Sequence, residues 1–333
     1  MNRRQALGVV GGVAAGWAAW ELFIPKGGLG TSLASGIARR VHGVGTVSSG
    51  AVNRQIPQDE FVATCRKFQA EAAADLAMPN VVDGLWRTEG FSTTFGKYRL
   101  DENTLNDSRI PRESLGIAHV GYGAACTEFT RFDTAKLLEI SETKCHPDYR
   151  HQMLEGVGSI LRIYEPGLFK KMCGMMGLIP ADAGEGPDRS GFFRSFLSAF
   201  PDEVQRLMTH GYGRLVAFSK MMGVHSAIDE ARQLPAERQA AAVQGIAFAF
   251  SMMNAADMGR HLERSSTLDF QRAAFQDGLV YALVYCDWFA PGFLAKWKPE
   301  GKLEERLVAK AIAESSANLK RGHMLAFKLE NPT

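Results

Sequence analysis

The order of small, polar and aromatic positions recurs along the chain, and its clearest copy is PAERQAAAVQGIAFAFSMMNAAD, residues Pro235 to Asp257. A helix-start residue is followed nine or ten positions later by a glycine and then by small and aromatic residues. Five copies share this order: Pro111 to Gly121, Pro147 to Gly156, Pro201 to Gly211, Pro235 to Gly245 and Asp269 to Gly278. Successive glycines are 35, 55, 34 and 33 residues apart. A period near 34 residues is typical of arrays of helical hairpins.

Each copy predicts a helix. Proline fits the first helical turn, where its missing N–H has no partner, and acidic residues favour the positive helix N-terminus. In the clearest copy Ala242, Gly245, Ala249 and Met252 recur at the spacing of one helix face. A glycine in mid-helix costs about 1 kcal/mol relative to alanine, so its recurrence predicts a second helix crossing with no room for a Cβ atom. We therefore expect an all-α fold, an array of helical hairpins of about 34 residues similar to tetratricopeptide α/α repeats.

The pattern divides the chain into five segments. Asp59 to Ala77 is apolar along one face and predicts an amphipathic helix. From Val81 to Arg109 the glycines at 84, 90 and 96 interrupt the periodicity, which predicts an irregular connection. The predicted boundaries are 1–26 for a hydrophobic helix, 27–55 for a linker, 56–110 for the N-terminal helix and irregular connection, 111–298 for the helical-repeat domain, and 299–333 for a capping helix and tail.

The N-terminus has the layout of a targeting segment. Arg3 and Arg4 precede an uncharged run from Gln5 to Trp20, and the twin arginine is similar to a Tat signal. We interpret residues 1–26 as an uncleaved signal anchor in the inner membrane, with the body in the periplasm. A glycine- and alanine-rich helix packed on the body, and a cytoplasmic body, are the alternatives.

Composition excludes several functional classes. The chain has 333 residues and a net charge of +2, which argues against an extended nucleic-acid surface. Its five cysteines form no CxxC pair, so we expect buried thiols and no disulfide framework. Cys145, His146 and His151 lack a second ligand cluster, and no metal site is predicted. Phosphate-binding loops and the common hydrolase motifs are absent, and we expect no cofactor.

The candidate site follows from the motif glycines. Equivalent positions of stacked repeats face one side, so polar and aromatic residues near these glycines are expected to line a shared pocket for an elongated, partly apolar small molecule. The predicted ligand-binding residues are Glu155, His210, Gln244, Asp277, Tyr122, Tyr212, Phe248 and Tyr281. Glu155, His210 and Asp277 are the candidates for acid–base catalysis. The alternative is that each polar side chain only satisfies a neighbouring helix.

At these motifs the chain resembles a bacterial family of unknown molecular role that is associated with enediyne polyketide biosynthesis clusters. The matching residues, between Pro111 and Asp257, are His119-Val-Gly-Tyr-Gly-Ala, Glu155-Gly-Val-Gly, His210-Gly-Tyr-Gly-Arg-Leu and Gln244-Gly-Ile-Ala-Phe-Ala. The resemblance implies genes nearby for a repeat-containing extracytoplasmic protein and for a multi-pass membrane protein. The family supplies no agreed catalytic residues. The N-terminal hydrophobic segment and the copy at Asp269 to Trp297 depart from its pattern.

Three functions are compatible with the sequence. The first is a membrane-tethered helical-repeat accessory protein that binds a partly apolar ligand, a membrane partner or a biosynthetic enzyme. The second is an enzyme of polyketide or lipid maturation with acid–base residues in a helical cavity. The third is a structural scaffold without a ligand.

Overall fold

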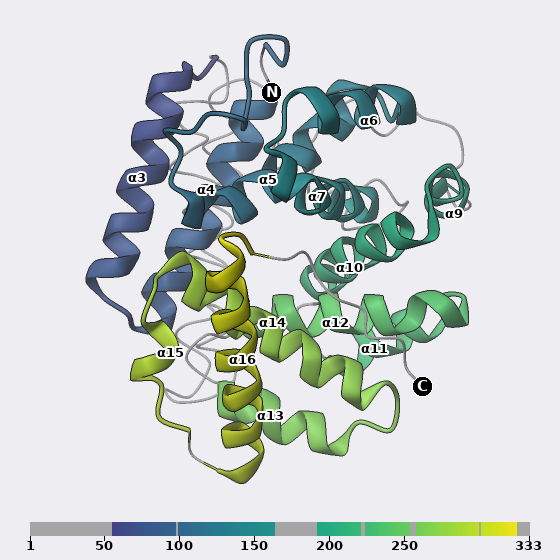
Figure 1. Ribbon diagram of the computed structural model, residues 1–333. Helices are drawn as coiled ribbons and strands as arrows, with labels where there is room; N and C mark the ends of the chain where they lie inside the picture. Colours follow the sequence, from purple (N-terminus) through teal and green to yellow (C-terminus); the bar gives the residue numbers. More distant parts are fainter. Residues whose placement is uncertain are drawn as a thin grey trace, which may run out of the picture.

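The computed structural model describes residues 55–97, 99–163, 192–220, 224–253, 258–299 and 301–324. These residues form helices and turns and contain no strand, which confirms the predicted all-α class (Figure 1). The predicted signal anchor at 1–26, and all but the last residue of the linker at 27–55, lie outside the described residues. Within the described part of the chain, no helix has both the length and the apolar character needed to span a bilayer.

The first two helices are α3 (Gln58–Ala74) and α4 (Met78–Lys97). Helix α3 buries the predicted apolar face. An irregular connection was predicted within residues 56–110, but Met78–Lys97 form the regular helix α4. The glycines of α4 allow close packing and do not break the helix. A Cβ at Gly84 would lie 2.8 Å from a ring carbon of Phe289, and one at Gly96 would lie 2.9 Å from the Cβ of Ala125.

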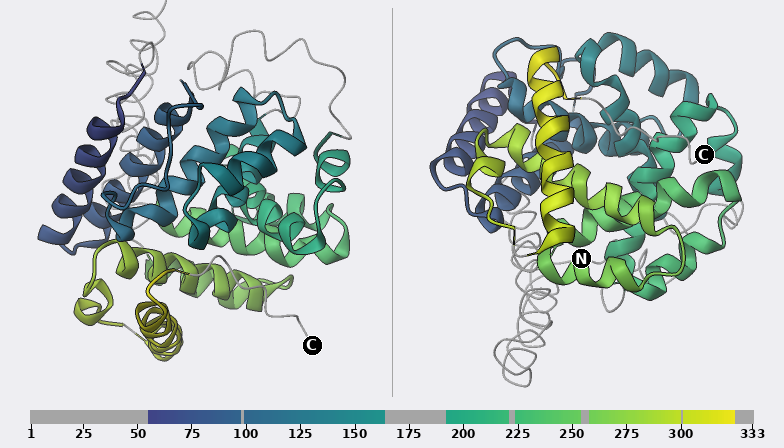
Figure 2. Two further views of the ribbon diagram at one scale, coloured as in Figure 1. Left: turned by 45° about the horizontal axis from the view of Figure 1, so that its top comes forward. Right: turned by 60° about the horizontal axis from the view of Figure 1, so that its bottom comes forward.

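Six of the described helices follow one another around the molecule. They are α4, α5 (Arg112–Phe129), α7 (Arg150–Ile163), α10 (Asp202–Ser219), α12 (Ala236–Met253) and α14 (Arg272–Phe289). Each packs on the next, and α14 returns to contact α4 and α5. The indole N–H of Trp288 on α14 donates to the carbonyl oxygen of Arg112 at 3.3 Å. The six helices therefore close into a ring, which the right-hand view of Figure 2 shows with α16 lying across it.

The motif glycines lie where adjacent helices of the ring cross. A Cβ atom on each would come within 2.3 Å of the carbonyl oxygen of the residue that precedes the glycine on the previous helix. The pairs are Gly121 with Glu89, Gly156 with Val120, Gly211 with Glu155, Gly245 with His210, and Gly278 with Gln244. Because Glu89 precedes Gly90, α4 occupies the same register as the five copies seen in the sequence. All five of these crossing glycines are buried.

A second glycine follows two residues after each of Gly121, Gly156 and Gly211, and it contacts the next helix of the ring. A Cβ at Gly123, Gly158 or Gly213 would lie 1.9–2.2 Å from a carbonyl oxygen of the next helix. On α4 the corresponding position is Ser92, whose hydroxyl donates to the carbonyl oxygen of Ala118 at 2.5 Å. The backbones therefore touch at two points where α5 crosses α7, where α7 crosses α10 and where α10 crosses α12.

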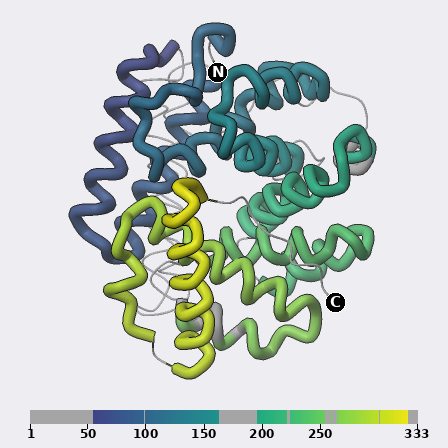
Figure 3. Tube along the Cα trace, viewed as in Figure 1, coloured from purple at the N-terminus to yellow at the C-terminus, as the bar shows by residue number. Residues whose placement is uncertain are grey.

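Shorter helices connect the ring helices, and one longer helix follows them (Figure 3). The short ones are α6 (Thr134–Thr143), the 3-10 turn η1 (Pro147–Tyr149), α9 (Phe192–Leu197), α11 (Val224–Arg232), α13 (Met258–Thr267) and α15 (Phe293–Lys296). The C-terminal helix α16 (Lys302–Arg321) packs on α14 and ends at Gly322. Gly322 has a φ of 84°, a left-handed conformation that glycine adopts without strain.

Replacing a crossing glycine should unfold the ring. In Gly245→Ala the new Cβ would lie 1.9 Å from the carbonyl oxygen of His210. A backbone atom cannot rotate away, so we expect a loss of about 3 kcal/mol or more in unfolding free energy. The control is Gly259→Ala on α13, where no atom lies within 4 Å of the Cβ. This control should be stabilised by up to about 1 kcal/mol. Urea unfolding followed by circular dichroism measures both, and equal midpoints would contradict the role of the crossing.

Candidate functional site

Charged and aromatic side chains from five ring helices meet inside the ring. We call this group the central polar cluster. Its members are Glu89 of α4, Glu155 of α7, His210 and Arg214 of α10, Phe248 of α12, and Tyr281 and Tyr285 of α14. Each is at most 8% exposed. The cluster therefore lies in a medium where charges must be paired.

Arg214 connects three helices of the ring. Its Nη2 donates to Oε2 of Glu89 at 2.8 Å, and its Nη1 donates to Oε1 of Glu155 at 3.2 Å. The same carboxylate oxygen of Glu155 lies 3.1 Å from Nδ1 of His210. Two carboxylates thus face one guanidinium and one imidazole in the protein interior.

Aromatic rings enclose these charges. The guanidinium of Arg214 lies 4.9 Å from the ring centre of Phe248, within the range of a cation–π contact. Tyr281 makes edge contacts with His210 and with Tyr285, at 5.4 Å and 5.2 Å between ring centres. Tyr285 crosses the interior, and a Cβ on Gly116 of α5 would lie 3.3 Å from its hydroxyl oxygen.

The surroundings fix the protonation of the cluster. Burial alone would raise the pKa of Glu155, but the attraction of His210 and Arg214 outweighs it and lowers that pKa below its ordinary value. Burial also opposes the charge of Arg214, and the carboxylates of Glu89 and Glu155 more than compensate, so its pKa is raised. Burial raises the pKa of Tyr285 well above its usual value. At neutral pH the cluster therefore contains a carboxylate at Glu155, a guanidinium and a neutral phenol.

Several buried polar atoms around the cluster lack a hydrogen-bond partner among the described residues. They include Oε2 of Glu155, the hydroxyl of Tyr285 and Oε1 of Gln244. Glu155 is fully buried and Gln244 is 3% exposed. An unpaired buried polar atom costs about 1–3 kcal/mol, and more for a charged group. Such atoms indicate a place that a ligand group or an ordered water can occupy.

Four of the eight predicted ligand-binding residues belong to the cluster: Glu155, His210, Phe248 and Tyr281. The other buried polar residue of the prediction, Gln244, lies on α12 one turn before Phe248. Asp277 does not join them, because its Oδ1 forms an ion pair with Nζ of Lys310 on α16 at 2.8 Å. It is therefore a contact to the C-terminal helix.

Tyr122 and Tyr212 point to other partners. The hydroxyl of Tyr122 donates to the carbonyl oxygen of Asn103 at 3.2 Å, and that of Tyr212 lies 3.5 Å from Oε1 of Glu230. Both tyrosines directly follow a motif glycine, whereas Phe248 and Tyr281 come three residues after one. On a helix with 3.6 residues per turn, these two positions are roughly 200° apart and face opposite sides.

The prediction missed Glu89, Arg214 and Tyr285. Arg214 lies four residues after His210, which places it on the same helix face, and Tyr285 is related to Tyr281 in the same way. Glu89 directly precedes Gly90, as Glu155 precedes Gly156. The i to i+4 spacing could therefore have found Arg214 and Tyr285. The position before a glycine could have found Glu89, provided that α4 was recognised as a helix of the ring.

A second buried imidazole has a structural role. Nδ1 of His119 lies 2.7 Å from the carbonyl oxygen of Leu115, and its Nε2 lies 3.0 Å from the backbone nitrogen of His146. Because a backbone N–H donates to Nε2, the ring is neutral with its proton on Nδ1. Burial lowers the pKa of His119 from 6.5 to about 3. His119 thus attaches the turn before α7 to α5.

The described residues contain no group of three or more histidine, cysteine or acidic side chains arranged to hold a metal ion. No protein-family model, curated protein or solved structure matches the chain significantly. The cluster is therefore interpreted from its geometry alone.

The neutral state of His119 should make stability depend on pH. The unfolded chain binds the proton near pH 6.5 and the folded chain only near pH 3. The stability that depends on neutral His119 is therefore complete above pH 6.5 and decreases as the pH falls towards 3. His119→Gln should reduce the slope of unfolding free energy against pH in this window by up to about 1.4 kcal/mol per unit. Urea unfolding at several pH values measures the slope.

The exposed His151 provides the control for that measurement. His151→Gln should keep the pH dependence of the parent chain. A similar reduction in both variants, or none in His119→Gln, would contradict the assignment.

Proposed function

We propose that this protein is a helical-repeat binding protein that holds a small, partly apolar ligand at the centre of a ring of tetratricopeptide-like α/α hairpins. Two observations support the repeat: the spacing of the motif glycines in the sequence, and the constant register of their contacts with the preceding helix. The ring brings polar side chains of several helices together in its interior.

The observation that carries the proposal is the Glu155 carboxylate. It is fully buried, one oxygen is held by Arg214 and His210, and the other oxygen has no partner among the described residues. A buried charge normally uses all of its hydrogen-bonding capacity. An oxygen left open in this position suits a ligand that donates a hydrogen bond.

The surroundings define the ligand chemistry. Glu155 and Gln244 offer acceptor oxygens, and Tyr285 offers a phenol that can donate or accept. Phe248, Tyr281 and Tyr285 supply aromatic surface beside them. These groups favour an uncharged or cationic molecule that carries a hydroxyl, amine or amide on an apolar body.

A second function is favoured by the contact between His210 and Glu155. A carboxylate 3.1 Å from Nδ1 orients an imidazole as in many acid–base catalysts, so an enzyme of polyketide or lipid maturation is the alternative. In that case Glu155 and His210 form the catalytic pair without Asp277, which contacts Lys310.

A ligand should accompany the chain on purification from its source cells. We expect about one organic molecule per chain when the native protein is extracted and analysed by mass spectrometry. Glu155→Gln should reduce this occupancy at least about tenfold, because a hydrogen bond to a charged group contributes about 1.5–3 kcal/mol. Asp277→Asn is the matched control, since Asp277 also precedes a motif glycine but pairs with α16.

Absence of the molecule from the parent chain, or equal occupancy in both variants, would contradict ligand binding at the cluster and favour a scaffold. Tyr285→Phe keeps the ring and removes only the hydroxyl, and circular dichroism checks that each variant folds. If Glu155→Gln retains the ligand but loses function in cells, the catalytic alternative is supported.

We also propose that residues 1–26 tether the protein to the inner membrane, with the body in the periplasm. Arg3, Arg4 and the uncharged run from Gln5 to Trp20 support this. A tethered binding protein would act beside a multi-pass membrane protein or a biosynthetic enzyme. The resemblance to the enediyne-associated family favours such partners, and nucleic acid is not expected.

Membrane fractionation tests the tether. The full chain should sediment with membranes and resist extraction by carbonate, because a buried apolar segment contributes far more than surface charge. A chain that lacks residues 1–26 should move to the soluble fraction. Unchanged partitioning of the shortened chain would contradict the tether without bearing on the central polar cluster.

A further inference from the structure

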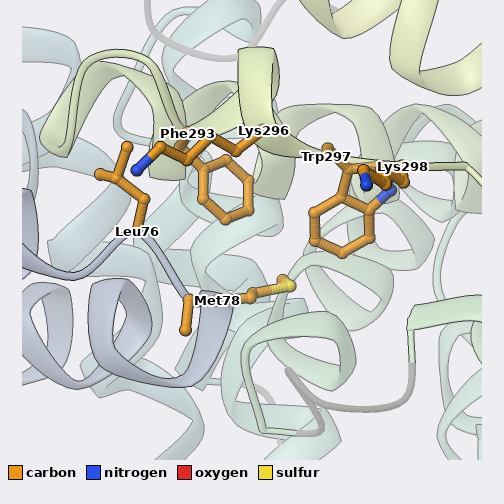
Figure 4. A pocket seen from close by; sticks show the side chains of 7 residues that line it. Leu76, Met78, Phe293, Lys296, Trp297 and Lys298 are labelled. Atoms are coloured by element: carbon orange, nitrogen blue, oxygen red, sulfur yellow. The ribbon is translucent and has the colours of Figure 1, made fainter.

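A hollow of about 290 Å³ lies at the junction between the turn joining α3 to α4 and the segment that follows α14. Figure 4 shows Leu76 and Met78 opposite Phe293 and Trp297, with Lys296 and Lys298 beside them. The hollow is separate from the central polar cluster and shares none of its residues. Its volume is near the lower end of small-ligand sites, which are about 300–1,000 Å³.

Five of the seven lining residues have apolar side chains: Leu76, Ala77, Met78, Phe293 and Trp297. Met78 and Phe293 are buried, and Phe293 packs on Trp297 with 5.5 Å between ring centres. The indole N–H of Trp297 donates to Oε1 of Glu304 on α16 at 2.8 Å, which fixes the ring and occupies its polar atom. The surface that Trp297 turns to the hollow is therefore available for apolar contact only.

Two lysines lie on the rim of the hollow. Lys296 and Lys298 are exposed, and neither forms an ion pair with any other described residue. Two ammonium groups beside apolar side chains complement a molecule with an acyl chain and an anionic head.

We propose that this hollow is a second binding site, which takes an amphipathic anion with its acyl chain against Met78, Phe293 and Trp297 and its anionic group between Lys296 and Lys298. The site joins α3 and α4 to the segment after α14, where the ring of helices closes. Occupation of the site therefore favours the closed ring, since a ligand that binds only the folded state stabilises it.

Binding of decanoate to the full chain tests the site, with saturation-transfer NMR as the readout. The parent chain should bind decanoate, and 1-decanol at matched concentration should bind more weakly. Lys296→Gln/Lys298→Gln should raise the dissociation constant about tenfold, because each exposed charge contributes a few-fold. Ala77→Trp, which fills the hollow from an exposed lining position, should abolish binding without removing charge.

The matched control is Lys302→Gln/Lys320→Gln, which removes two exposed lysines of α16 outside the hollow. It should bind decanoate like the parent chain. Equal binding in all variants, or equal binding of decanol, would overturn the proposal.

A second measurement distinguishes the source of the anion. It compares binding to vesicles of phosphatidylglycerol and phosphatidylcholine with binding to vesicles of phosphatidylcholine alone. A free acyl anion is indicated when decanoate binds and Lys296→Gln/Lys298→Gln leaves binding to both kinds of vesicle unchanged. Bilayer lipid is indicated when Lys296→Gln/Lys298→Gln abolishes binding to the anionic vesicles.

Discussion

The structure depends on direct backbone contact between neighbouring helices. At Gly156, Gly211 and Gly245 the carbonyl oxygen of the preceding helix occupies the place that a Cβ would need. Such a crossing gives up the apolar area that a leucine or valine would bury, and each glycine weakens its own helix by about 1 kcal/mol relative to alanine. In exchange, the helix axes approach closely enough for six helices to close into a ring with a small interior.

The small interior explains why charged and aromatic side chains meet there. On each ring helix the residue before the glycine and the residue four positions later share a face. His210 and Arg214 occupy these two positions on α10, and Glu155 and Glu89 occupy the first of them on α7 and α4. Because the interior is narrow, side chains from helices that are not neighbours in the ring come within hydrogen-bonding distance.

The sequence predicted where the helices of the ring lie along the chain better than which of their side chains point into the interior. The proline-to-glycine spacing located α5, α7, α10, α12 and α14, because capping and close crossing both leave local signals. It failed for α4, where Gly84 and Gly96 pack against Phe289 and Ala125 in tertiary contacts that no local pattern reports. Four of the eight predicted ligand-binding residues lie in the cluster. Tyr122 and Tyr212 do not, because positions one and three residues after a glycine face opposite sides of a helix. Asp277 lies outside the cluster, and its ion pair with Lys310 depends on where α16 docks, which no local pattern indicates.

The charges of the cluster are not explained by stability alone. Replacing a buried ion pair by apolar residues of similar volume is often neutral or stabilising, because desolvation offsets the attraction between the charges. The glycine crossings already set the distance between adjacent helices, but a pair joined at one crossing can still pivot.

Arg214 adds a different constraint, because it joins α10 to Glu89 of α4 across the interior. Trp86 of α4 and Phe218 of α10 join the same two helices by a ring contact. The network therefore fixes the arrangement of helices that share no glycine crossing. The same arrangement holds one oxygen of Glu155 in place, while its other oxygen has no partner among the described residues. A purely structural network would be expected to satisfy both oxygens, and this difference favours a binding role for the interior.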